Sequence, residues 1–247
     1  ITNIAAALPA HAAADGFVDG LVVMGYHPDR PEYQALWLAL LDRGYRVTPV
    51  AEMDIGLSEE RLADRDVVML NHVTVAGHGD GAAAFSAALA AARLGRVCCS
   101  SGPVLDLSVD GQPLGSVVAT SPAATHRVVL QIAGPPDAEG MRLDRLELLG
   151  AGGQTLWRRD DSVGGWFEVA VPGRAHRGYV VARALGPSTT GSYKGRRAVA
   201  VSAPVYLHPR GTGFEAPAVT ELGLTFRDDS PWRGGSFTVQ DAAGGVL

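Results

Sequence analysis

The pattern of apolar and polar residues changes near residue 96, and this change constrains the fold more than any other feature. From there onward, short runs in which apolar and polar residues alternate are separated by Gly, Pro and Asp. They read RVCCS, VLDLSV, HRVVLQIA, LDRLELLG, QTLWRR, GWFEVAV, GYVVARAL, RRAVAVSAPVYL, ELGLTF and GSFTV. Such alternation is typical of strands buried on one face, and turn residues at this spacing predict an antiparallel β-sandwich. We expect a domain boundary near residue 100, with the sandwich over residues 100–247.

The residues before this point alternate strand and helix signals instead. FVDGLVVMGY, YRVTPV and DVVMLNHVTV predict buried strands. A helix is predicted between the first two, with Asp29 as its N-cap, Pro31 in its first turn and Gly44 as its stop. A second, alanine-rich helix, GAAAFSAALAAARLG, ends at Gly95. This order of elements predicts part of an α/β layered or barrel domain over residues 1–99.

Composition narrows the classes of partner. The 247 residues are 47% apolar, which allows a sizeable core, and the formal net charge of −5 leaves no basic surplus for phosphates. We therefore expect neither nucleic acid nor a membrane as a partner, and no apolar run is long enough for a membrane helix. The only cysteines, Cys98 and Cys99, are adjacent and are expected to be reduced thiols, which weakly favours the cytoplasm. The start at Ile1 rather than Met is consistent with removal of an upstream leader or domain, so the compartment stays open.

An acidic pair follows the strand YRVTPV. Glu52 and Asp54 stand two residues apart in the segment AEMDIG, so in an extended chain they point the same way. Two carboxylates that share a site raise the pKa of one of them, which suits a general acid or base. The alternative is that both residues cap or solvate the acidic loop GLSEERLADRD that follows.

Histidines supply the other candidate side chains. NHVTVAGHGDG contains His72 and His78, whose spacing is not by itself that of a metal site, and Asp80, which is expected to cap the alanine-rich helix. His27 follows the first predicted strand, so we expect it at the same strand-end edge as the acidic pair. A structural role for His72 and a simple loop position for His27 are the alternatives. Four other histidines have no cluster of candidate polar residues near them in the sequence and are expected at the surface: His11, His126, His176 and His208.

Several sequence segments, taken in their order along the chain, resemble those of a known family. They are LPAHAAADGFVDGLVVMGYH, LWLALLDRGYRVTPVAEMD, LNHVTV, ALAAARLGRVCCSSGPVLDLSVDGQPLGS, GGWFEVAVPG and RAVAVSAPVYL. Over roughly residues 8 to 208, the chain resembles the carboxyl-terminal half of the CehA/McbA-type metallohydrolases, a branch of the PHP (polymerase and histidinol phosphatase) superfamily. The resemblance implies a partial PHP-like (β/α) barrel remnant over residues 1–99, with its metal site at the strand ends. An antiparallel β-sandwich over residues 100–247 would follow.

The chain departs from the family at the implied metal site. Asp54 keeps the position of a metal-binding aspartate, but Gly56 stands where the family has a histidine, and His72 replaces an arginine. The family's early His-x-His pair would lie before Ile1. A catalytic metal needs about three protein ligands, so the resemblance implies a degraded site in which Asp54 is the residual ligand. We expect no cofactor, and a divalent metal, Zn or Mn, is the alternative.

Two functions follow from this interpretation. In the first, Asp54, Glu52 and His72 carry out acid–base chemistry on a small molecule, which His27 and His78 contact, or they complete a site with a partner chain. In the second, the chain is a non-catalytic binding or scaffold subunit of a hetero-oligomer. Too few strands precede residue 100 to close a barrel, which leaves open strand edges and a bare apolar face. We therefore expect a dimer or a hetero-oligomer.

Overall fold

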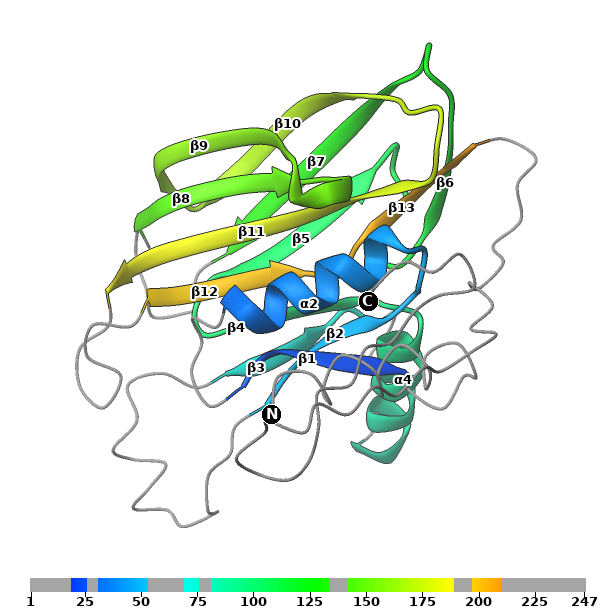
Figure 1. Ribbon diagram of the computed structural model, residues 1–247. Coiled ribbons are helices and arrows are strands. Elements are labelled where there is room, and N and C mark those ends of the chain that lie inside the picture. Colours follow the sequence, from blue (N-terminus) through cyan, green and yellow to red (C-terminus); the bar gives the residue numbers. More distant parts are fainter. Residues whose placement is uncertain are drawn as a thin grey trace, which may run out of the picture.

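Strands dominate the part of the chain that the structure describes. This structure is a computed structural model, and it describes residues 19–25, 31–52, 69–75, 81–133, 142–188 and 197–209. Over these residues the protein is mostly β, with two α-helices, a large mainly antiparallel sheet, a three-stranded sheet and a small parallel pair (Figure 1). The described strands close no barrel.

The large sheet is the central layer. Its strands run in the order β3 (Leu70–Val73), β4 (Val97–Ser100), β12 (Arg197–Ser202), β11 (Gly178–Ser188), β13 (Val205–Pro209) and β6 (Val117–Thr120). Strand β8 (Arg142–Leu149) also pairs with β11, and β9 (Thr155–Val163) pairs with β8. A 3₁₀ turn, η1 (Ala151–Gly153), joins these last two. Only the β13–β6 pair of this sheet is parallel.

A three-stranded antiparallel sheet packs on one face of the large sheet. It consists of β10 (Gly165–Pro172), β7 (Thr125–Ala133) and β5 (Val104–Val109). Burial alternates strictly along β7 except at its middle, as the alternation of apolar and polar residues predicts. The core between the two sheets contains Leu107 and Leu130 from the small sheet and Leu146 and Leu207 from the large one.

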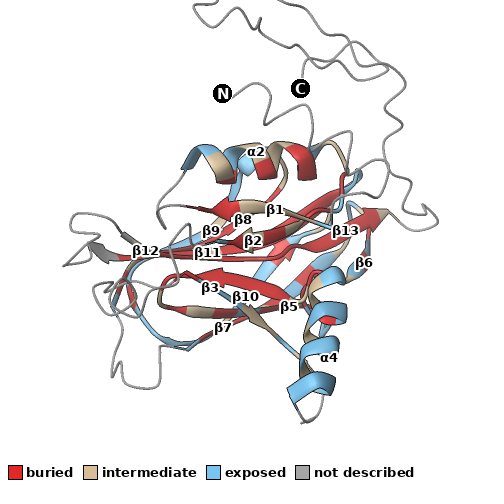
Figure 2. Cartoon of the chain, turned by 90° about the horizontal axis from the view of Figure 1, so that it is seen from below, coloured by how far each residue is buried: buried red, intermediate tan, exposed pale blue. Residues whose placement is uncertain are grey.

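The other face of the large sheet carries the parallel pair β1 (Gly20–Met24) and β2 (Thr48–Ala51) together with helix α2 (Pro31–Asp42) (Figure 2). A second core forms there around Trp37, whose ring N–H donates to the Val47 carbonyl at 2.8 Å. The helix ends at Asp42, and Gly44, the predicted stop residue just beyond it, has a left-handed φ of 88°. Cys98 and Cys99 point into the two different cores, and both are free thiols.

Helix α4 (Gly81–Arg93) projects from the edge of this assembly, and Ala91 is its only buried residue (Figure 2). Its carboxyl end is packed tightly. A Cβ at Gly115, which has φ of 78°, would overlap the Leu94 carbonyl, so only glycine fits against this end of the helix. No helix in the described ranges is long and apolar enough to cross a membrane.

The elements agree with most of the predicted runs. Strand β6 was not predicted, and RRAVAVSAPVYL contributes two strands, β12 and β13, instead of one. The runs ELGLTF and GSFTV lie outside the described residues. Strand β3 precedes residue 100 and β4 runs up to Ser100, yet both belong to the same sheet as β11 and β12. The division at residues 99 and 100 stays a prediction.

Candidate functional site

The acidic pair was expected where strand β2 ends, and Glu52 is the member that the structure describes. It directly follows β2, and its backbone N–H donates to the Met24 carbonyl of β1 at 2.9 Å. Its side chain is exposed, and its Oε1 would lie 3.0 Å from a Cβ on Gly25. The same Cβ would lie 3.2 Å from the Tyr33 ring, so the absence of a side chain at Gly25 makes room for both groups.

Asn71 of β3 is the polar residue that joins this edge to the large sheet. Its carboxamide oxygen accepts from the Ala51 N–H at 2.8 Å, and its amide nitrogen donates to the Ala51 carbonyl at 2.7 Å. The side chain thus pairs with the backbone of β2 as a neighbouring strand would, one residue before Glu52. The Cys99 thiol lies 3.5 Å from the same carboxamide oxygen. Sequence reasoning missed Asn71, although an asparagine beside His72 in an apolar strand is a signal for such a role.

His72 lies next to Asn71 but on the other face of β3, because side chains alternate along a strand. The register agrees with this, since Asn71 is opposite Cys99 and His72 is opposite Cys98, which belong to different cores. His72 is half-buried, and burial lowers its pKa below the usual value, which favours the neutral ring at neutral pH.

Three of the predicted site residues, Asp54, His27 and His78, lie outside the described residues, so their roles stay predictions. Within the described ranges, no group of three or more His, Cys, Asp or Glu side chains is placed to hold a metal ion. The described part of the strand-end edge therefore does not by itself fit the metal that the family resemblance implies.

His126 was expected at the surface, and this expectation is wrong. It is 2% exposed and lies between Asp110 and Thr120. Its Nδ1 is 2.7 Å from the Asp110 carboxylate, and its Nε2 is 2.8 Å from the Thr120 hydroxyl oxygen. That oxygen also accepts from the Arg174 N–H at 3.1 Å. The expectation failed because the partners come from β6 and from the turn after β5, which only the folded chain brings together.

The Asp110–His126–Thr120 arrangement resembles a catalytic triad in its bonding but not in its access. The Thr120 hydroxyl is buried, so it is not available to attack a substrate. Burial pushes the pKa of Asp110 upward, but the hydrogen bonds from His126 and from the Arg127 N–H outweigh this and lower it. We interpret the arrangement as a structural link between neighbouring strands and turns.

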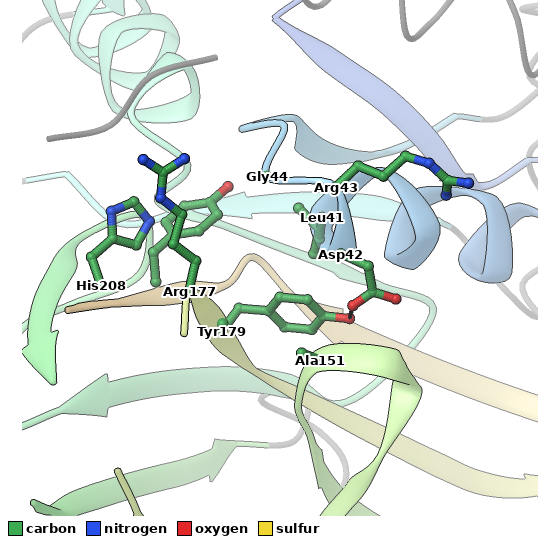
Figure 3. A pocket seen from close by; sticks show the side chains of 10 residues that line it. Leu41, Asp42, Arg43, Gly44, Ala151, Arg177, Tyr179 and His208 are labelled. Carbon is green, nitrogen blue, oxygen red and sulfur yellow. Dashed lines mark hydrogen bonds between the residues drawn. The ribbon is translucent and has the colours of Figure 1, made fainter. Parts of the chain in front are cut away.

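His208 was also expected at the surface, and it is instead buried in the wall of a pocket. The pocket lies between the end of α2, the start of β11, and β13 (Figure 3). A second pocket includes Arg46, Thr48 and Gly95, and the two pockets share Tyr206. The linings include Thr48 at the start of β2 and Gly44 and Arg46 just before it, whereas Glu52 follows the end of β2.

Comparison of the sequence with protein-family models gives no match, and comparison with curated proteins gives none either. Any functional assignment therefore rests on the residues and their geometry.

Proposed function

We propose that this chain is a diverged relative of the PHP-type metallohydrolases, corresponding to the carboxyl-terminal half of the CehA/McbA branch. In this proposal, the elements β1, α2, β2, β3 and α4 are the remnant of a (β/α) barrel, and an antiparallel β-sandwich follows them. The parallel pair β1–β2 with its connecting helix supports the first part. The packing of β5, β7 and β10 on the large sheet supports the second.

The proposed activity is hydrolase-like acid–base chemistry on a small molecule at the strand-end edge, either by this chain alone or in a site completed by a partner chain. The observation that carries it is the position of Glu52 at the carboxyl end of a parallel pair. In open α/β sheets, ligands bind outside the carboxyl ends of the strands. The Asn71 side chain supports the same edge, because it holds β2 in place one residue before Glu52.

Within this proposal, Glu52 and Asp54 form the acid–base pair. In such a pair, one carboxylic acid donates a proton to the substrate and the other carboxylate accepts one. His72 is the predicted third member of the acid–base group, but its ring lies on the face of β3 opposite Asn71, away from β2, so the pair of carboxylates carries the proposal. His27 and His78 contact the substrate. Asp54 is also the residual ligand position of the degraded metal site.

A hydrolysis screen tests the proposal. The purified chain is incubated with panels of phosphate esters, carboxylic esters and amides, with and without added Mn²⁺ or Zn²⁺. For any substrate that is turned over, we expect Glu52→Gln and Asp54→Asn each to reduce kcat by about 100-fold, the lower range for loss of a general acid or base. The matched control is Glu168→Gln, an exposed glutamate on β10. Equal turnover in all variants would contradict the proposal.

The alternative function, a non-catalytic scaffold subunit, is favoured by one specific observation. Helix α4 carries no charged residue from Gly81 to Ala92, yet Phe85 is 65% exposed and Leu89 is 52% exposed. A helix that is apolar all round is normally buried. The neighbouring strand β3 is at the end of the large sheet and exposes Leu70. In this alternative, α4 and β3 form the surface that a second subunit covers.

A further inference from the structure

One wall of the pocket presents the basic side chains of Arg177 and His208 (Figure 3), and Tyr206 also lines the pocket. It is a small pocket of about 90 Å³ that opens to solvent. Arg177 precedes β11 and is exposed, whereas His208 belongs to β13 and is buried. In Figure 3 their side chains lie side by side on the same wall.

A third basic group acts on this wall from its other side. The Arg46 guanidinium stands over the Tyr206 ring, 4.8 Å from its centroid. The Tyr206 and His208 rings in turn meet edge to face, with centroids 6.4 Å apart. Arg46, Tyr206 and His208 thus form a contiguous group, and Arg177 lies next to it.

The electrostatic field at this wall disfavours additional positive charge. Burial lowers the pKa of His208, and the positive charges of Arg177 and Arg46 lower it further. Burial disfavours a charge of either sign, but the positive charges of Arg177 and Arg46 that oppose a proton on His208 favour an anion beside them. The neutral imidazole also keeps one N–H that is able to donate a hydrogen bond.

The acidic residue of the pocket is engaged on the opposite wall. The Asp42 Oδ1 accepts from the Tyr179 hydroxyl at 2.9 Å and from the Gly152 N–H at 2.7 Å. In Figure 3 the Asp42 carboxylate points toward the Tyr179 hydroxyl and away from Arg177 and His208. Its charge is therefore stabilised by two donors at a distance from the basic wall.

We propose that this pocket binds a small oxyanion, the phosphate or carboxylate group of a small molecule, at the wall formed by Arg177, His208 and Tyr206. A guanidinium presents paired N–H donors whose geometry matches both groups. Because Arg177 is exposed at the pocket rim, it is able to meet the ligand without a rearrangement of the core. The site is separate from the Glu52 edge.

Isothermal titration calorimetry with inorganic phosphate, and separately with acetate, tests this inference on the full chain. We expect saturable binding at one site per chain, with a Kd of about 1 mM or tighter, for at least one of the two ions. Saturation by phosphate alone identifies a phosphate site, and saturation by acetate identifies a carboxylate site. No saturable heat with either ion would overturn the proposal.

Two variants and a control separate local contacts from general charge. Arg177→Gln and His208→Gln are each expected to weaken binding by about 10-fold or more, since they remove a direct donor. Arg142→Gln is the control, because it removes the same charge from an exposed arginine at the opposite end of β8 from the pocket. An equal weakening by the control would overturn the proposal. The second variant keeps the test valid should the first fail to fold, which thermal unfolding establishes.

Discussion

At the scale of single residues, His126 shows how a buried polar group stabilises a fold without taking part in chemistry. Because the Asp110 carboxylate can only accept, the His126 Nδ1–H donates to it, and in the neutral ring the Nε2 then accepts from the Thr120 hydroxyl. The Thr120 oxygen also accepts from the Arg174 N–H. Each buried polar atom of the histidine thus has a partner. The consequence is that removing one member leaves another member buried and unpaired.

Thr120→Val is the substitution that tests this link most cleanly, because it keeps the shape of the side chain. We expect the free energy of unfolding to fall by about 1–3 kcal/mol, the cost of leaving buried polar groups without partners. Urea unfolding followed by circular dichroism measures it. Thr155→Val, at an exposed threonine on β9, is the matched control and is expected to change stability by less than about 0.5 kcal/mol. Equal effects at both positions would contradict the interpretation.

Asp110 makes the same link sensitive to acid. Its pKa in the folded state lies below the ordinary value of 3.8, so its stabilising effect is present above that value. The effect is lost as the pH falls through the lowered pKa. We therefore expect the difference in unfolding free energy between the wild type and Asp110→Asn to shrink as the pH is lowered from 6 toward about 3. A difference that is constant over this range would rule out the lowered pKa.

At the scale of elements, an ion pair between a buried glutamate and a partly buried arginine fastens helix α2 to the large sheet. Arg183 of β11 lies opposite Glu147 of β8, and its Nη2 and Nε are 2.7 and 2.8 Å from the same carboxylate oxygen. Its Nη1 donates to the Gln34 side chain of α2 at 3.2 Å. The side chain of Glu147 is 4% exposed, so its charge depends on Arg183 for compensation.

A double-mutant cycle measures this coupling. Arg183→Met is expected to lower the free energy of unfolding by about 3–5 kcal/mol, because it leaves the buried Glu147 charge uncompensated. Glu147→Leu is expected to cost less, because Arg183 is partly exposed and keeps its bond to Gln34. The double variant is expected to lose less than the sum of the two. The exposed pair Arg142–Asp161 is the control, with an expected coupling of about 1 kcal/mol or less. Additive losses at positions 147 and 183 would show that the pair is not coupled.

Sequence reasoning predicted features that depend on neighbouring residues in the chain, and it missed features that depend on which strands pair in the fold. Glycine stops and apolar periodicity are local signals. They predicted that α2 and α4 end just before Gly44 and Gly95, both of which have a positive φ. The link through His126 depends on which strands and turns become neighbours, and a single sequence does not contain that pairing. The run RRAVAVSAPVYL was predicted as one strand because the alternation continues through the point, near Pro204, where the chain leaves one stretch of β11 and pairs with another.

The candidate site was predicted only in part, for a related reason. The placement of Glu52 at a strand end follows from the local pattern and agrees with the structure. Asn71 was missed because its function is to pair with the backbone of β2, which lies 20 residues away in the chain. The anion pocket was missed because Arg177, His208 and Arg46 come from three separate segments.

At the scale of the whole molecule, the exposed apolar face of α4 predicts association. We expect a dimer at micromolar concentration in sedimentation velocity, because water is then excluded from Phe85 and Leu89. The double substitution Phe85→Ser and Leu89→Ser is expected to shift the chain toward monomer. Val163→Ser, at an exposed valine on β9, is the control. A wild-type chain that stays monomeric at these concentrations would contradict the prediction.

The account as a whole depends on the claim that, within residues 1–247, only Asp54 stands at a metal-ligand position of the proposed relatives. Elemental analysis of the chain, purified without a chelator, tests this claim most directly. The account predicts no stoichiometric transition metal, and no change in metal content on Asp54→Asn, because one carboxylate does not hold a catalytic ion. One or more zinc, manganese or iron ions per chain would contradict it and would indicate His27, His72 or His78 as additional ligands.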